Sequence, residues 1–308
     1  MAVPLLIDTD MGIDDAVAAC MAITSDALEV RSVVGVGGNA PVDQVVANIG
    51  RLMAATRPPD QPKIGRGLDQ AAAAGPDRRA RFGDDGFGNC DLPSVPMKAI
   101  DFRQVYRETI EGAEGDLVIL ALGPLTNLAA FFDESPELFK SVKQIHLTGG
   151  AVWTRGNATE SAEFNFHRDP SAAAKLLASG LPITVTPLDV TNLVCLDESH
   201  VAHLAASGYR TGEVLAKLLR FAIEQDDEPS YGKCHVADAL TVGSLLWPDL
   251  FLKTRMRLEI TTRGTHAGQS KPALGGDHRE RVDLLTAVNA VDFLENLLEQ
   301  LCHEAFVV

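Results

Sequence analysis

The sequence predicts an α/β fold in which a doubly wound, mostly parallel sheet is flanked by helices. Short runs rich in Val, Ile and Leu recur without alternating polar residues, which is typical of strands covered on both faces. Segments with helical periodicity lie between these runs, so strand and helix alternate along the chain. The 308 residues, 46% hydrophobic and 22% charged, are enough to bury such a core.

The expected elements follow one another from the amino terminus. Unbroken apolar runs predict strands at residues 3–7, 30–34, 117–122, 142–147 and 183–185, and strand character returns at 258–262. A helix is expected to begin near Ile13. Apolar residues at helical spacing predict further helices at 42–55, 102–111, 125–132, 170–178 and 287–301.

We expect residues 1–308 to form one domain with two insertions. Residues 57–96 are rich in Pro, Gly, Asp and Arg, which favours long loops at the rim of a site. Residues 196–236 have a helical pattern that the acidic, proline-containing stretch 226–229 interrupts. Both insertions are candidates for a lid over the site.

The composition limits the class of partner. A net charge of −15 and a pI near 4.9 disfavour nucleic acid polymers and membrane surfaces, so a small neutral molecule is the expected ligand. Five scattered cysteines without a CxxC pair fit reduced thiols better than a disulfide frame or a zinc site. With no signal peptide or membrane span apparent, we expect a cytoplasmic location.

The segment Asp8-Thr9-Asp10-Met11-Gly12-Ile13-Asp14-Asp15-Ala16 places four carboxylates directly after the first strand. Asp14 and Asp15 by themselves would be explained as acidic residues at a helix start. Asp8 and Asp10 stand at the carboxyl end of a strand, where ligand sites of open α/β sheets lie. Carboxylates aimed at one point favour a hard divalent cation such as Ca²⁺ or Mg²⁺.

This segment resembles the amino-terminal signature of the nucleoside hydrolases, the inosine-uridine-preferring N-ribohydrolase family. The resemblance continues in order along nearly the whole chain, through Gly38-Asn39, Leu122-Gly123-Pro124-Leu125-Thr126-Asn127, Gly149-Gly150-Ala151, Gly156-Asn157-Ala158-Thr159, Ala162-Glu163-Phe164-Asn165 with Asp169-Pro170, and Asp238-Ala239-Leu240. It implies a homodimer or homotetramer that hydrolyses the N-glycosidic bond of ribonucleosides to ribose and free base, as in purine or pyrimidine salvage.

The resemblance also implies roles for individual residues. Asp10, Asp15, Asp238 and the main-chain carbonyl of Leu122 would bind Ca²⁺, which accepts six to eight oxygen ligands. Asp10 would take a proton from the attacking water, and Asp14 would hold the ribose 2′-hydroxyl. The remaining ribose hydroxyls would be bound by Asn39, Asn157, Glu163 and Asn165, although each of these, taken singly, also fits a turn or strand-edge residue.

The residues that would protonate the leaving base depart from the family pattern. Ala237 and Phe82 stand where the pyrimidine-active and broad-specificity branches have histidines. The sequence around Asp238 is closer to the purine-specific branch, in which aromatic rings stack on the base, and Phe82 is a candidate for one such ring. His235, three residues before Asp238, is a candidate replacement for the missing acid. We therefore expect a purine bias.

Two other functions remain open. With both usual histidines replaced, the chain could bind a ribosyl compound without hydrolysing it. Asp8-Thr9-Asp10 after a strand also fits the start of a haloacid-dehalogenase-type phosphatase, whose first aspartate attacks phosphorus. Gly12 replaces the Thr or Val that this pattern needs, and an acidic surface would repel phosphate.

Overall fold

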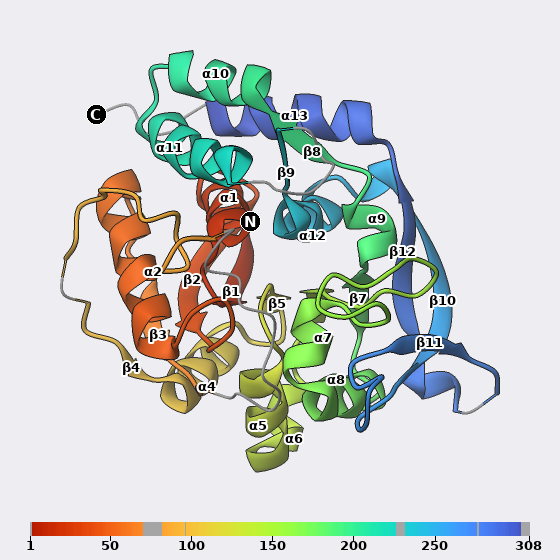
Figure 1. Ribbon diagram of the computed structural model, residues 1–308. Coiled ribbons are helices and arrows are strands. Elements are labelled where there is room, and N and C mark those ends of the chain that lie inside the picture. The colour runs from red at the N-terminus through yellow and green to blue at the C-terminus, as the bar shows by residue number, and fades with distance from the viewer. Residues whose placement is uncertain (1, 70–81, 96, 226–231, 276, 303–308) are drawn as a thin grey trace.

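The computed structural model describes residues 2–69, 82–95, 97–225, 232–275 and 277–302. Its centre is a ten-stranded sheet in the order β11-β10-β12-β7-β6-β5-β1-β2-β3-β4. Every neighbouring pair from β12 to β4 is parallel, whereas β10 is antiparallel to both β12 and β11. The prediction of a mostly parallel sheet flanked by helices is confirmed (Figure 1).

The strand bounds show how short the central strands are. They are β1 (Val3–Thr9), β2 (Leu28–Gly35), β3 (Lys63–Arg66), β4 (Ile100–Asp101), β5 (Val118–Ala121), β6 (Gln144–Thr148), β7 (Ile183–Thr186), β10 (Phe251–Ile260), β11 (Ser270–Ala273) and β12 (Val282–Val288), with a separate antiparallel pair of β8 (Cys195–Asp197) and β9 (Lys233–His235).

Alternate residues of the central strand β1 enter two different cores. Leu5 and Ile7 belong to one hydrophobic cluster and Leu6 to another, and none of the three is exposed to solvent. Because successive strand side chains point to opposite faces, a strand covered on both sides must be apolar at consecutive positions. This is why unbroken apolar runs predicted the central strands well.

Helices cover both faces of the sheet. The cluster containing Leu5 includes residues of α1 (Ile13–Ile23), α2 (Val42–Thr56), α10 (Glu198–Ala206), α11 (Arg210–Glu224), α12 (Ala237–Leu246) and α13 (Ala290–Cys302). The cluster containing Leu6 includes residues of α4 (Phe102–Gly112), α5 (Thr126–Glu134), α6 (Pro136–Phe139), α7 (Phe164–Arg168) and α8 (Pro170–Leu177). Shorter elements are α9 (Leu188–Thr191), η1 (Pro248–Leu250) and η2 (His278–Glu280).

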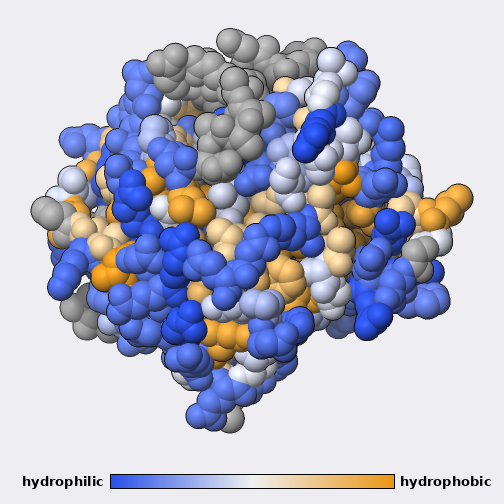
Figure 2. Space-filling model, turned by 90° about the horizontal axis from the view of Figure 1, so that it is seen from below, coloured by the Kyte–Doolittle hydropathy of each residue, from blue (hydrophilic) through white to orange (hydrophobic). Residues whose placement is uncertain are grey.

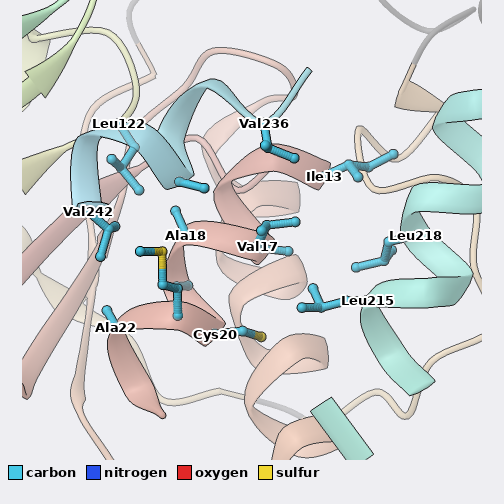
Figure 3. Packing of buried hydrophobic residues seen from close by; sticks show 14 of the residues in the cluster. Ile13, Val17, Ala18, Cys20, Ala22, Leu122, Leu215, Leu218, Val236 and Val242 are labelled. Carbon is cyan, nitrogen blue, oxygen red and sulfur yellow. The ribbon is translucent and has the colours of Figure 1, made fainter. Parts of the chain in front are cut away.

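Helix α1 is buried on nearly all sides. Val17 and Cys20 of α1 lie close to Leu215 and Leu218 of α11, and Val242 of α12 lies beside α1 (Figure 3). Burying an apolar helix in this way stabilises it through the removal of apolar surface from water. The packing fixes the start of α1, which carries Asp14 and Asp15, relative to α12, which carries Asp238.

Several elements differ from the expectations. Strand β3 lies within residues 57–96, where we expected loops, and β8 and β9 lie within the segment of helical pattern. The expected helix at 287–301 begins later, at Ala290, because Ala287 pairs with Leu252 in the ladder between β12 and β10. Residues 226–229 lie outside the described residues.

The surface is polar over much of one face (Figure 2). On the face seen from below, hydrophilic residues predominate and apolar residues form separate patches (Figure 2). Among the described helices, none combines the length and the apolar character that a membrane crossing requires.

Candidate active site

The acidic segment after β1 forms a tight connection into α1. Thr9 Oγ1 donates to Asp15 Oδ1 at 2.5 Å, and the Gly12 backbone N–H donates to Asp15 Oδ2 at 2.9 Å. Met11, between them, is fully buried and has a positive φ of 36°. Such a conformation is unfavourable for a residue with a side chain, and it persists where surrounding contacts impose it, often at functional sites.

Three carboxylates from α1 and α12 converge beside this connection. Asp14, Asp15 and Asp238 each offer an oxygen within 4.8 Å of the others. Burial, followed by the charge of Asp14, raises the pKa of Asp15 to about 7. The pKa of Asp238 is also raised, first by burial and then by the charges of Asp15 and Asp14. Like charges held together in this way fit a site that a cation neutralises.

Asp10 is held by the loop that follows β2. The Asn39 backbone N–H donates to Asp10 Oδ2 at 2.7 Å. A Cβ atom on Gly38 would lie 2.1 Å from the same oxygen, so the loop can pass this close only with glycine there. Asn39 Oδ1 is buried and accepts no hydrogen bond from any described residue. An orphaned acceptor beside a carboxylate cluster fits the hydroxyl group of a ligand.

A second loop, which follows β6, also reaches the site. Glu163 caps α7 and accepts hydrogen bonds from the backbone N–H groups of Asn165, Phe166 and Gly150. Asn165 Nδ2 donates to the carbonyl of Leu122 at 2.7 Å and to that of Thr148 at 3.1 Å. The amide of Asn165 therefore joins the ends of β5 and β6 to this loop.

Strand β11 and helix α9 brace that second loop. Ser270 Oγ accepts from Ala151 N–H and donates to Ala151 O, both at 2.9 Å. Ala162 forms an isolated antiparallel bridge with Gln269. Asp189 accepts from the backbone N–H groups of Val152 and Trp153 at 2.8 and 2.7 Å. These contacts fix the base of the loop.

Together the two loops and the carboxylate cluster line a hollow that opens to solvent. It has the polar lining that a sugar requires. Its lining residues are Asp10, Asp14, Asp15, Asn39, Leu122, Thr148, Asn157, Glu163, Phe164, Asn165, Leu188, Ala237 and Asp238. All the metal and ribose ligands implied by the family resemblance are among them.

The two residues considered for the leaving base lie elsewhere. Phe82 is 6% exposed and belongs to the hydrophobic cluster that also contains Phe87. His235 lies in β9, and its Nδ1 donates to the carbonyl of Val194 at 3.2 Å. Neither is among the described residues that line the hollow. Ala237 does line it, so the lining has a methyl group where a histidine would be expected in other branches.

Sequence reasoning missed three lining residues, Thr148, Phe164 and Leu188. Thr148 hydrogen-bonds Asp238 and contacts Thr241 Oγ1 at 2.7 Å. It is the last residue of β6, so the rule that ligands bind beyond the carboxyl ends of parallel strands could have found it. Leu188 follows β7 in the same way but carries no chemical signal of its own.

Polar side chains gathered beyond the carboxyl ends of a parallel sheet are typical of a class, the α/β enzymes that act on a small polar substrate. The family model described as "Inosine-uridine preferring nucleoside hydrolase" matches residues 5–295, and the chain belongs to this family. The family membership predicted from the sequence is therefore confirmed, and the chain is a hydrolase of N-glycosyl compounds.

Individual relatives resemble the chain over most of its length. An uncharacterized protein of Schizosaccharomyces pombe is 32% identical over 315 residues, covering 96% of this chain and 98% of its own length. A pyrimidine-specific ribonucleoside hydrolase of Salmonella schwarzengrund is 29% identical, covering 86% of each chain. The structure of a purine-preferring ribonucleoside hydrolase from Gardnerella vaginalis is 27% identical with a TM-score of 0.91, covering 97% of this chain and 98% of that one.

Proposed function

We propose that the protein is a calcium-dependent hydrolase that cleaves ribonucleosides to ribose and free base, with a bias towards purines. The convergence of the carboxylate cluster with two ribose-binding loops in one hollow carries this proposal. The site combines hard oxygen ligands on one side with amide and carboxylate groups for hydroxyls on the other. Such a division suits a sugar bound against a cation.

The proposed metal ligands are the carboxylates of Asp10, Asp15 and Asp238 and the carbonyl of Leu122, which all line the hollow. A donor set made entirely of oxygen favours Ca²⁺ or Mg²⁺ over zinc or copper, and a loose set of carboxylates and a carbonyl favours the larger Ca²⁺. When bound, the cation would supply Lewis-acid polarisation of water and of the ribose hydroxyls.

The remaining chemistry belongs to the side chains of the chain. Asp10, held by the Asn39 backbone N–H, would accept the proton of the attacking water. Asp14, half-buried at the start of α1, would accept a hydrogen bond from the 2′-hydroxyl. Asn39, Asn157, Glu163 and Asn165 would bind the other hydroxyls, and the surrounding carboxylates would stabilise the positive charge that develops on the sugar.

The purine bias rests on the leaving-group side of the hollow. Ala237 supplies no proton, and Phe164 is an aromatic residue in the lining. For Phe82 to stack on the base it would have to leave its core position, and for His235 to act as acid it would have to break its bond to Val194. The relatives point both ways, since one structure is described as purine-preferring and one curated relative as pyrimidine-specific, so the proposed bias rests on the lining alone.

We further propose that residues 1–308 act as one domain, that segments 57–96 and 196–236 shape the rim or lid of the site, and that the protein is a cytoplasmic homodimer or homotetramer. The five cysteines are free in the structure, which suits a reducing compartment. A role in purine or pyrimidine salvage would follow from the activity.

Release of ribose from purine, pyrimidine and nicotinamide ribosides, measured with chelator and with added Ca²⁺, tests the proposed function. We expect release that chelation abolishes, Ca²⁺ restores and purines favour. Asp10→Asn should bind ribosides but release almost no ribose. A wild-type protein that binds ribosides and Ca²⁺ without releasing ribose would instead be the non-hydrolytic binding protein. Release of phosphate from sugar phosphates would indicate the phosphatase.

A further inference from the structure

We propose that Asn127 is a positioning residue for the hydrolysis, because its amide fixes the loop that orients Asp10. This inference rests on the proposed role of Asp10 as the base. Asn127 lies in α5, is fully buried and is not among the described residues that line the hollow. It therefore acts through other groups without touching substrate.

The amide of Asn127 joins the carboxyl ends of three adjacent strands. Its Nδ2 donates to Asp8 Oδ2 at 2.8 Å, near the end of β1, and to Gly35 O at 3.2 Å, at the end of β2. Its Oδ1 accepts from the Leu68 backbone N–H at 2.8 Å, just after β3. One acceptor and two donors are all required, so neither aspartate nor an apolar residue can make the same set of bonds.

A continuous set of contacts leads from this amide to Asp10. The carbonyl of Leu68 accepts from the Gly37 N–H at 2.9 Å. The next residue, Gly38, lies directly against the Asp10 carboxylate, and the Asn39 N–H donates to it at 2.7 Å. The position of residues 67–69 therefore sets the path of residues 35–39, and that path sets the orientation of Asp10.

The packing around the Asn127 amide leaves little space for it to move. A Cβ atom on Gly67 would lie 2.3 Å from Asn127 Nδ2 and 2.4 Å from Gly35 O. Side chain and backbone are thus in direct contact, and a movement of the amide is transmitted to both loops. Because reactive groups misplaced by about 1 Å can cost about 100-fold in rate, a residue outside the site can control the reaction in this way.

Tyr106 offers a matched control. Its hydroxyl donates to the same oxygen of Asp8 at 2.8 Å, and its ring packs against Phe102, Phe131 and Phe139 in the core. Tyr106→Phe therefore removes a hydrogen bond to Asp8 while the bonds of Asn127 to Gly35 and Leu68 remain. A role of Asn127 confined to holding Asp8 would make the two substitutions equivalent in their effect on kcat.

The test compares Asn127→Ala with Tyr106→Phe in the full-length protein, at saturating Ca²⁺ and well below both unfolding temperatures. We expect both substitutions to lower the unfolding temperature. Asn127→Ala should lower kcat for the best riboside by about 10- to 100-fold, while Tyr106→Phe should stay within about threefold of wild type. Equal kcat values for the two variants, or a wild-type kcat in Asn127→Ala, would overturn the proposal.

Hydrogen exchange at residues 35–39 gives a readout that does not need activity. Asn127→Ala should speed exchange of the Gly37 and Asn39 amides, and Tyr106→Phe should not; unchanged exchange in Asn127→Ala would overturn the proposal. If wild type releases no ribose, the proposed function fails, and this comparison still decides whether Asn127 fixes the loop. If Asn127→Ala does not fold, Gly67→Ala, which displaces the same amide, should show the same exchange pattern.

Exchanging the amide and the carboxylate between positions 127 and 8 gives a rescue experiment. Asn127→Asp removes both donors and places a second carboxyl beside Asp8, so we expect a loss at least as large as in Asn127→Ala. In the double variant with Asp8→Asn, the new amide at position 8 can donate to the new carboxylate at position 127. We expect kcat to recover at least threefold over Asn127→Asp, and no recovery would show that the bond to position 8 does not hold the side chain at position 127 in place.

Discussion

Alanine at position 38 would test directly whether the orientation of Asp10 controls the rate. The new Cβ atom would lie 2.1 Å from Asp10 Oδ2 and 2.7 Å from Asp10 Cβ and Cγ. Since Cβ contacts stay beyond 3.0 Å, the loop or the carboxylate must move by about 0.9 Å. A displacement of this size at a reacting group costs about 100-fold in rate, or about 2.7 kcal/mol of transition-state stabilisation.

The assay is release of ribose over a range of riboside concentrations, together with thermal unfolding. Gly112→Ala is the matched control, because Gly112 ends α4 and a Cβ atom there has nothing within 4 Å. We expect Gly38→Ala to lower kcat/KM by about 100-fold and Gly112→Ala to leave kcat/KM unchanged. A value for Gly38→Ala within threefold of wild type would show that the placement of Asp10 does not limit the reaction.

Three further outcomes follow from buried charges. Burial lowers the pKa of His146 to about 4 in the folded protein. In the unfolded chain this histidine has a pKa near 6.5 and binds the proton more readily. The free energy of unfolding should therefore fall by about 3 kcal/mol for this group as pH drops from about 6.5 to 4. Denaturant titrations of His146→Asn at pH 7 and 4.5 should show a smaller loss than wild type, and an equal loss would exclude His146 as the cause. In the presence of chelator, Asp238→Asn should raise the unfolding temperature, because it removes like-charge repulsion. Ca²⁺ at 100 times its Kd should raise the unfolding temperature of wild type by about 5 °C, and Asp238→Asn should abolish this rise. A variant that Ca²⁺ still stabilises would show that Asp238 is not a ligand. Arg51 pairs with Asp85 at 2.6 Å, with side chains 13% and 20% exposed, so Arg51→Ala should lower the free energy of unfolding by about 2 kcal/mol. A double-mutant cycle with Asp85→Ala measures the share of that loss that belongs to the pair, because Arg51 also donates to the carbonyl of Cys90.

The sequence predicted the central sheet because its strands are buried on both faces and apolar at successive positions. It missed β3, whose four residues Lys63–Arg66 include two exposed charged side chains, and it extended a helix into β12 because a strand and a helix can share one apolar run. Strands this short or this mixed in character are recognised only by their pairing partners.

Some residues of the candidate site could be predicted from local sequence, and others depend on tertiary packing. Asp10, Asp14 and Asp15 are adjacent in sequence, so their convergence could be predicted from a strand followed by a turn and a helix. Asp238 could be joined to them only through the family resemblance, because its position depends on the packing of α12 against α1. The side-chain directions of Phe82 and His235 depend on tertiary packing in the same way, and spacing along the chain does not determine them.

The bracing of the loop at residues 151–163 by Ser270 and Gln269 has a consequence for synthesis on the ribosome. The acidic connection is made early, yet Asp238 follows more than two hundred residues later, and β11, which braces the loop at residues 151–163, follows Asp238. Contacts so distant along the chain form late and slowly. A nascent chain that ends before β11 can therefore assemble most of the parallel sheet while the loop at residues 151–163 still lacks its braces.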